Sequence, residues 1–222
     1  MMIKLKKWRA LAIAVLASFN LWGSAEAASD VRITQIPLSI PESFIAKDAS
    51  VKFKASGPTL LFSDSPEMVY HNGILYRDTV QGRVRLFYHH VNAVAGTKKL
   101  AILLKNEQIR PLHYKVLRQG IAGPGYNYME VGKKSQRNYF ASTDQQQSSG
   151  SLSFGHSVEL LSGRGVLLDT EQLATGTIDL ELDRPTQISV MLCEPPSDLE
   201  LFNDAATLQP MDEHPLRGTF TK

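Results

Sequence analysis

Short runs of β-forming residues, separated by turns that contain glycine or proline, fill most of the sequence between residues 51 and 193. Such runs, with turn signals about every 8–12 residues, are typical of antiparallel β proteins. The longest run, residues 83–92, has apolar side chains on both faces, which predicts a central strand covered on both sides. The chain is therefore expected to be mainly β.

Residues 120–140 interrupt this pattern. A glycine-rich turn leads to Asn127, a favourable N-cap, and Glu130 follows three residues later as in a capping box. These signals predict one α-helix at about residues 128–141. Gly132 weakens such a helix, so we expect it to be a position of close packing.

About ten short antiparallel strands with one inserted helix predict a β-sandwich that is immunoglobulin-like in the broad sense. A closed barrel and a jelly roll are the alternatives. The dipeptide Asn72-Gly73 lies between two β-patterned runs, residues 68–71 and 74–76. It predicts a tight hairpin turn there, because a type I′ turn requires positive φ at both central positions.

The N-terminus has the pattern of a secretory signal peptide. Four basic residues precede an apolar run at residues 10–21, and Ala25-Glu26-Ala27 forms an A-x-A cleavage site before Ala28. The apolar run is shorter than the 20 or so residues that a membrane anchor needs, so membrane contact is expected only through this leader before its removal. The mature protein is expected to be exported, either periplasmic or extracellular.

Three segments follow from these patterns: the signal peptide at residues 1–27, a β-sandwich domain at residues 28–194, and a tail at residues 195–222. The tail has few apolar residues before residues 216–220, which predicts a poorly packed segment or the start of a further module. Cys193 is the only cysteine of the sequence, and within an apolar run it is expected to be a small buried hydrophobe.

Charge gives no general reason to bind nucleic acid. The whole sequence has a net charge of +2, but removal of residues 1–27 leaves 20 Lys and Arg against 21 Asp and Glu, a net charge of −1. A nearly neutral mature protein lacks the basic surface that nucleic acids or anionic membranes attract.

No catalytic motif accompanies the β pattern. The segment around Lys133 resembles a phosphate-binding loop, but Asn127 stands where its first glycine should be, and Lys134 separates Lys133 from Ser135. No G-x-S-x-G elbow is found in the sequence either. We therefore expect a non-enzymatic domain without a cofactor.

The best candidate binding surface is the 120–140 stretch, where exposed tyrosines and cations gather around one helix. Aromatic rings offer flat apolar area with a polar handle, and cations attract acidic groups. The expected partner is an envelope polysaccharide or protein. The residues predicted to bind it are Tyr126, Asn127, Tyr128, Lys133, Lys134 and Arg137.

Two other functions are alternatives. A carbohydrate-active hydrolase would use two of the carboxylates Asp64, Glu67 and Asp78 at a set separation. A metal-binding module would use histidines. Since His89 and His90 are adjacent in a predicted strand and point to opposite faces, only one of them could join His113.

Several segments of the chain resemble a known group of proteins. They are Ser-Pro-Glu-Met-Val-Tyr at 65–70, Gly-Ile-Leu-Tyr-Arg-Asp at 73–78, Arg-Leu-Phe-Tyr-His-His-Val-Asn at 85–92, and the stretch from Ala122-Gly-Pro to Val131-Gly-Lys. They are similar to exported bacterial proteins without established activity, some associated with copper-amine-oxidase-like N-terminal envelope modules. The resemblance covers roughly residues 60–193 and implies an envelope location, without implying a copper site.

Export and processing can be checked directly. The protein recovered from outside the cytoplasm should begin at Ala28, because signal peptidase cuts after the A-x-A motif. Intact mass and N-terminal sequencing of the exported protein would show this. Recovery of the chain with residues 1–27 still attached would contradict the prediction.

Overall fold

The computed structural model describes residues 56–142, 148–161 and 166–221. All of them belong to one compact unit, Phe53–Lys222, and the predicted signal peptide lies outside the described residues. Neither helix in the described ranges has the length and apolar character needed to cross a membrane.

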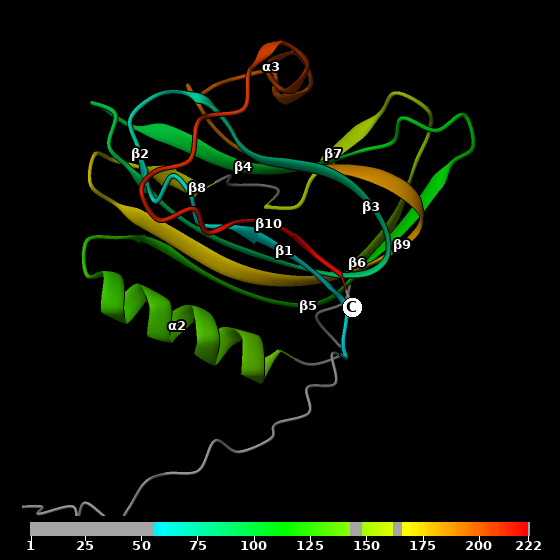
Figure 1. The fold of residues 1–222 in the computed structure, drawn as a ribbon, viewed down its shortest axis with the longest axis horizontal. Helices are drawn as coiled ribbons and strands as arrows, with labels where there is room; N and C mark the ends of the chain where they lie inside the picture. The colour runs from blue at the N-terminus through cyan, green and yellow to red at the C-terminus, as the bar shows by residue number, and fades with distance from the viewer. Residues whose placement is uncertain (1–55, 143–147, 162–165, 222) are drawn as a thin grey trace, which may run out of the picture. The chain divides into compact units, whose positions relative to one another are not determined.

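Ten strands and two helices make up this part of the chain, so the predicted mainly β fold is confirmed (Figure 1). The helix expected at 128–141 is present with those bounds, and Asn127 caps it by accepting a hydrogen bond from the backbone N–H of Glu130. The strands are β1 Thr59–Ser63, β2 Met68–Val69, β3 Gly73–Asn92, β4 Lys98–Lys105, β5 Leu112–Gly125, β6 Ser148–Leu152, β7 Ser157–Glu159, β8 Val166–Leu168, β9 Leu173–Cys193 and β10 Arg217–Phe220; the helices are α2 Tyr128–Ala141 and α3 Leu199–Ala205.

Two long strands form the backbone of the fold. β3 has 20 residues and β9 has 21, and they pair antiparallel from Gly73↔Leu192 to Val91↔Leu173. Their register shifts between Val80↔Thr186 and Gly82↔Leu182, so that three residues of β9 lie opposite one of β3. Gly82 has φ +84° at this bulge, a conformation that suits glycine. The paired strands bend there and pass from one layer to the other (Figure 1).

All ten strands belong to one hydrogen-bonded sheet, and the bend folds it into two packed layers, which we call the first and the second sheet. The first sheet contains β10, β1, β2, the second half of β3, the first half of β9, β5 and β6. The second sheet contains the first half of β3, the second half of β9, β4, β7 and β8. The predicted sandwich is thus present. It differs in detail, because β3, β5 and β9 are long and because β1 and β2 pair with β3 in parallel.

The core lies between the two sheets and is made of alternate residues from their strands. Completely buried members of it include Leu61, Leu86, Tyr88, Leu100, Ile102, Ile178, Leu180 and Val190. The alternation follows from strand geometry, in which successive side chains point to opposite faces.

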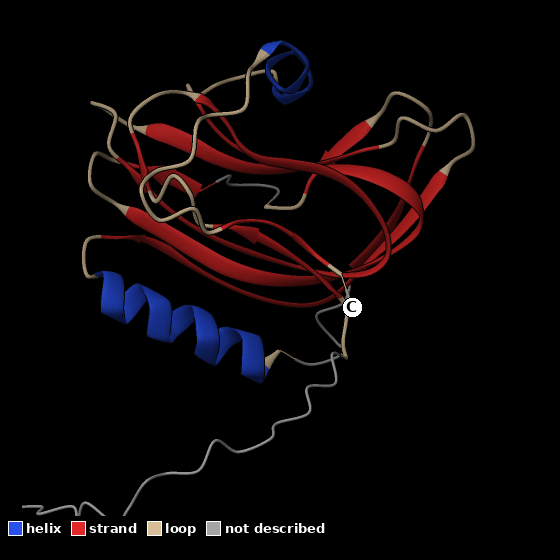
Figure 2. Ribbon diagram, viewed as in Figure 1, coloured by secondary structure: helices blue, strands red, loops and turns tan. Residues whose placement is uncertain are grey.

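One helix packs on the outer face of each sheet, as Figure 2 shows. On the second sheet, Leu199 and Phe202 of α3 pack against a cluster that includes Ile74 and Met191. On the first sheet, Val131 of α2 joins a cluster with Ala122, Leu173 and Val91. The hydroxyl of Ser135 also donates to the backbone oxygen of Gly120 at 3.0 Å.

The hairpin expected at Asn72-Gly73 is wrong. Gly73 instead begins β3, and β2 pairs in parallel with the far end of that strand, with Met68 opposite Val91. The C-terminal segment supplies the reason, since the side chain of Gln209 donates to the backbone oxygen of Asn72 at 3.0 Å. A Cβ at Gly73 would lie 2.2 Å from Nε2 of this side chain, so a larger residue there would require Gln209 to move.

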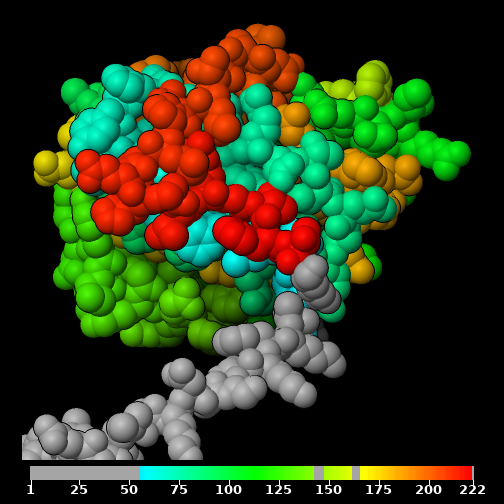
Figure 3. Space-filling view, viewed as in Figure 1, coloured from blue at the N-terminus to red at the C-terminus, as the bar shows by residue number. Residues whose placement is uncertain are grey.

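The expectation of a poorly packed tail is also wrong for the described residues after 195. β10 extends the first sheet by pairing with β1, and Leu208 bridges to Ile74. Arg217 Nη1 donates to three backbone oxygens, those of Ser65, Leu75 and Gln209, at 2.8–3.2 Å. Figure 3 shows this segment lying across the surface of the first three strands.

Close packing beneath α2 occurs at a different glycine from the one predicted. A Cβ at Gly132 would meet nothing within 4 Å, whereas a Cβ at Gly120 of β5 would lie 2.3 Å from the Cβ and backbone nitrogen of Tyr139. Gly120 therefore lets α2 approach the sheet, and Gly132 does not take part in that contact.

These two glycines give opposite predictions for stability. Gly132→Ala should raise the free energy of unfolding by about 0.5–1 kcal/mol, because alanine favours a helix interior and has open space there. Gly120→Ala should lower it by about 1–3 kcal/mol, because backbone atoms of α2 must move. Urea unfolding of both variants measures this, and a loss of stability in Gly132→Ala would contradict the structure.

Candidate binding groove

A groove runs beside α2 on the outer face of the first sheet; we call it the α2–β3 groove. Its volume is about 390 Å³. Its lining residues come from β1, β3, β5, β9 and α2, and they are Leu60, Phe62, Arg85, Phe87, Arg118, Gln136, Tyr139, Phe140 and Thr177. The groove exists because α2 covers β5 and β9 but leaves the neighbouring faces of β3 and β1 open.

Strand alternation places these side chains outside the core. On β1, Phe62 follows the buried Leu61, and on β3, Arg85 and Phe87 alternate with the buried Leu86 and Tyr88. The outward residues of the two strands then lie side by side, because β1 pairs in parallel with β3 and places Phe62 opposite Phe87.

Aromatic rings form much of the groove surface. The rings of Phe62 and Phe87 have centroids 4.8 Å apart, and those of Tyr139 and Phe140 meet edge to face at 5.5 Å. Phe140 has 73% of its surface exposed. Beyond Phe87, the ring of His89 stacks at 6.4 Å and continues the aromatic surface along β3.

Arginine side chains stand beside these rings. Arg85 makes a two-pronged ion pair with Asp179, in which Nε and Nη2 donate at 2.7 and 2.8 Å. The hydroxyl of Tyr139 donates to the same carboxylate at 2.7 Å. The guanidinium carbons of Arg85 and Arg118 lie 5.4 and 5.3 Å from the centre of the Tyr139 ring, within the range of a cation–π contact.

This cluster fixes the charge of its members. Burial alone would raise the pKa of Asp179, but hydrogen bonds from Arg85 and Tyr139 and the charges of Arg85 and Arg118 outweigh it and hold the pKa below its ordinary value. The hydrogen bond to Asp179 in turn raises the pKa of Arg85, although burial opposes this. Arg85 therefore remains charged, with the ionised Asp179 beside it.

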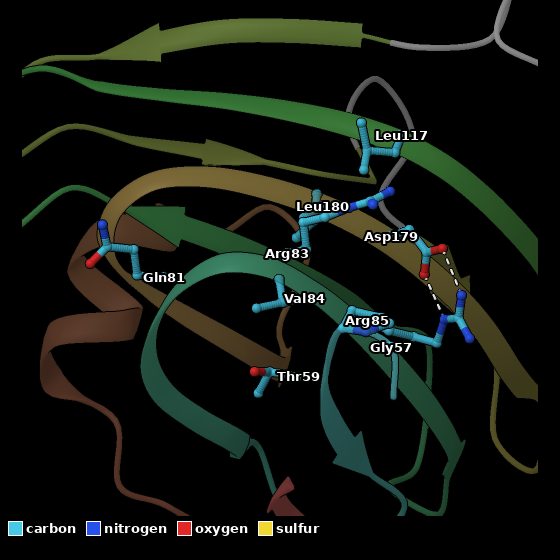
Figure 4. Close-up of a pocket in the computed structure, with 10 residues that line it drawn as sticks. Gly57, Thr59, Gln81, Arg83, Val84, Arg85, Leu117, Asp179 and Leu180 are labelled. Carbon is cyan, nitrogen blue, oxygen red and sulfur yellow. Dashed lines mark hydrogen bonds and ion pairs between the residues drawn. The ribbon is translucent and has the colours of Figure 1, made fainter. Parts of the chain in front are cut away.

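A second, larger hollow adjoins the groove and shares Arg85 with it. This open cavity has a volume of about 750 Å³, and its lining includes Thr59, Gln81, Arg83, Leu117 and Asp179. Figure 4 shows the guanidinium of Arg85 facing the Asp179 carboxylate, with Gln81 at the opposite end of the cavity. Among the described residues that line the two hollows, only Asp179 is acidic.

None of the six residues predicted to bind a partner lines this groove: four of them lie on α2, and Tyr126 and Asn127 come just before it. Tyr126 is 63% exposed and Tyr128 36%, and the Tyr128 hydroxyl donates to the backbone oxygen of Glu171 at 2.9 Å. Asn127 serves as the cap. Lys133, Lys134 and Arg137 are exposed, as expected.

Glu130 does not complete the expected capping box in full, since its carboxylate accepts a hydrogen bond from Lys133 at 3.0 Å. The binding role of the six predicted residues stays a prediction.

Sequence reasoning missed the lining of the groove, although one signal was present. In residues 83–90, the side chains Arg83, Arg85, Phe87 and His89 alternate with Val84, Leu86, Tyr88 and His90. The first set is a polar and aromatic face on an otherwise apolar strand, and such a face on a central strand indicates a surface with a use beyond packing. The local sequence did not indicate which strand would pair next to this one.

The three carboxylates of the hydrolase alternative do not form one site. Asp64 and Glu67 lie near each other at the end of β1, together with Asp212, whereas Asp78 lies on β3 opposite Ile188 in the second sheet and accepts a hydrogen bond from Thr219. Asp212 accepts hydrogen bonds from the Ser65 hydroxyl and the Glu67 backbone, both at 2.8 Å. Neither hollow is lined by any of the three predicted carboxylates.

Asp64 nevertheless has an unusual environment. Burial, and then the charges of Glu67 and Asp212, raise its pKa to about 7. Its Oδ1 atom is buried without a hydrogen-bond partner in the described part of the chain. A protonated Asp64 avoids placing a third negative charge beside the other two.

The histidines of the metal alternative are not brought together. His90 is buried, donating from Nδ1 to the Pro66 oxygen at 2.9 Å while Nε2 accepts from the Ser63 hydroxyl at 2.8 Å. His113 is exposed and bonded to Asp183 at 2.9 Å. His89 lies opposite Thr175 of β9, whereas His113 is next to the residue paired with Leu182, about 20 Å further along the strand.

Within residues 56–142, 148–161 and 166–221, no group of three or more His, Cys, Asp and Glu side chains is placed to hold a metal ion.

Comparisons with protein-family models, with curated proteins and with solved structures yield no match, so the functional argument depends on the geometry of the site.

The environment of Asp64 predicts a pH effect on stability. Because its pKa is about 7 in the folded chain and 3.8 ordinarily, the folded state holds a proton that the unfolded state has lost, and stability falls as the pH rises from about 4 to about 7. His90 acts in the opposite sense between about 4 and 6.5, because burial lowers its pKa to about 4 and stability is lost there as the pH falls.

Comparison with Asp64→Asn isolates the first effect. The unfolding free energy of the variant minus that of wild type should increase by on the order of 1 kcal/mol from pH 5 to pH 8, after allowance for the partial exposure of the carboxyl group. Urea unfolding at the two pH values gives the difference. Glu213→Gln, at an exposed carboxylate, is the control and should show no such change. An equal pH response in Asp64→Asn and wild type would contradict the assignment.

Proposed function

We propose that this is an exported, non-catalytic domain that binds an envelope polysaccharide in the α2–β3 groove. The observation that carries the proposal is the row of aromatic rings, the half-buried Phe62 and Phe87 and the exposed Phe140, in an open hollow on the outer face of the sheet. Contiguous apolar patches rimmed by polar residues often mark interaction sites, and concave aromatic surfaces with a few fixed polar groups are typical of ligand sites.

The shape of the groove supports a polysaccharide as the ligand. Sugar rings present flat apolar faces that can lie on aromatic rings, with hydroxyl groups at their edges. The groove offers both kinds of partner, since Gln136 and Thr177 stand beside the aromatic side chains. A hollow of about 390 Å³ suits a few sugar units of an extended chain. A protein partner would bury about 800 Å² on each side and would need a larger surface.

Two further features agree with an envelope role. The sequence predicts export, and the resemblance described above implies an extracytoplasmic location. Neither feature indicates what the ligand is, and the choice of a polysaccharide depends only on the groove. The stretch singled out in the sequence still contributes, because Gln136, Tyr139 and Phe140 come from the helix that it predicted, at positions further along than the six residues chosen there.

The aromatic residues provide the test. Phe140→Ala should weaken binding to polysaccharide by about 2- to 10-fold, because one aromatic contact contributes about 0.5–1.5 kcal/mol. Affinity electrophoresis of the purified protein through gels that contain xylan, galactomannan, polygalacturonate or hyaluronan measures the retardation. Phe154→Ala is a matched control, since Phe154 is 61% exposed and is not a lining residue of the groove.

Tyr126→Ala, at the beginning of the helix, separates the groove from the surface predicted by sequence. Weakening by Tyr126→Ala but not by Phe140→Ala would place binding at that surface and contradict the groove. An absence of retardation of wild type in all four polysaccharides would also count against the proposal.

A further inference from the structure

We infer that the α2–β3 groove selects an acidic polysaccharide, whose carboxylate groups are bound by Arg85 and Arg118. This inference rests on the proposed function and narrows it from polysaccharides in general to carboxylated ones. It depends on the charges of the groove and on the way in which its arginines are held.

The charge balance of the two hollows is positive. Among the described residues, Arg83, Arg85 and Arg118 line them, and Asp179 is the one acidic residue that does so. Arg83 lies opposite Glu181 in the register of β3 and β9, so the excess of positive charge in the described lining comes from Arg85 and Arg118, which share the charge of Asp179. A ligand with negative groups would complement these two arginines.

Arg85 is held ready for such a ligand. An arginine has five N–H donors, of which two bond to Asp179, so three remain for a second partner. The Asp179 side chain is only 17% exposed, while that of Arg85 is 40% exposed. The carboxylate thus holds the guanidinium in place, and Arg85 is the more accessible partner of the pair.

The Tyr139 ring completes the arrangement. Both guanidinium groups lie against it, at 5.4 and 5.3 Å, and its hydroxyl bonds to the carboxylate that holds Arg85. Long side chains that are already ordered lose less conformational entropy when a ligand binds. Asp179 and Tyr139 are therefore positioning residues, and Arg85 and Arg118 are the residues that contact the ligand.

A neutral polysaccharide would bind to this site less tightly. It could lie on Phe62, Phe87 and Phe140, but it would remove water from the arginines without supplying a charged partner, which is unfavourable. An acidic chain repays that desolvation through charge-assisted hydrogen bonds, which can be bidentate with arginine. The aromatic rings hence provide general affinity, and the arginines provide the preference for acidic sugars.

Arg118→Gln tests the preference. Wild type should bind polygalacturonate, the carboxylated probe, about tenfold more tightly than the neutral probe galactomannan in 50 mM salt. Arg118→Gln should weaken binding to polygalacturonate by about fivefold or more and leave binding to galactomannan unchanged. Arg118→Lys, which keeps the charge but not the planar fork, should recover part of the loss. Raising the salt to 500 mM should reduce binding to polygalacturonate alone.

Controls separate this inference from the proposed function. Arg110→Gln removes an exposed arginine that lies before β5 and lines neither hollow, and this variant should bind like wild type. Thermal unfolding of Arg118→Gln checks that α2 remains packed. If wild type binds both probes equally and Arg118→Gln changes nothing while Phe140→Ala still weakens binding, acid selectivity fails and polysaccharide binding stands.

If Phe140→Ala has no effect either, both proposals fail. Tighter binding to poly(glycerol phosphate) than to polygalacturonate would overturn the choice of carboxylate and assign a phosphate-bearing chain instead.

Discussion

The antiparallel pairing of β3 with β9 is the interaction on which the rest of the domain depends. These two strands form the centre of both sheets, because the bulge opposite Gln81 carries them from one layer to the other. β1 and β5 add to one half of the pair, and β4 adds to the other. The position of that single bend therefore sets which outward residues face α2 and which face α3.

The groove is a consequence of incomplete coverage. α2 is anchored over β5 by Val131, Ser135 and Tyr139, and the absence of a side chain at Gly120 lets it approach closely. The helix is too narrow to cover β3 and β1 as well, since an α-helix with its side chains is about 10–12 Å wide and spans only two or three strands. The uncovered strip carries Phe62, Phe87 and Arg85 beside the helix. The same contacts that hold α2 in place thus create the candidate site.

Local signals in the sequence predicted the structural features that depend on a few adjacent residues. Asn127 and the following periodic residues were sufficient for the bounds of α2, because capping is a property of a few adjacent residues. The hairpin predicted at Asn72-Gly73 was wrong, because a distant side chain, that of Gln209, hydrogen-bonds to the backbone there. The run expected at residues 83–92 is likewise only part of a longer strand, because Gly82 bends β3 without ending it.

The candidate site was harder to predict for the same reason. Arg85 and Phe87 show their outward direction in the alternation of residues 83–90, but their neighbours Phe62, Arg118 and Phe140 come from other elements. Only the parallel register of β1 on β3 and the placement of α2 bring them together.

The order of strand pairing in the sheet also determines when the domain can fold. β3 has to wait for β9, about 100 residues later, and β1 acquires its outer neighbour only when residues 217–220 are present. Such long-range pairing slows folding. The sheet is complete only after residues 217–220 have been made, and such late completion would suit a chain that crosses a membrane unfolded, as the signal-peptide pattern of the sequence predicts.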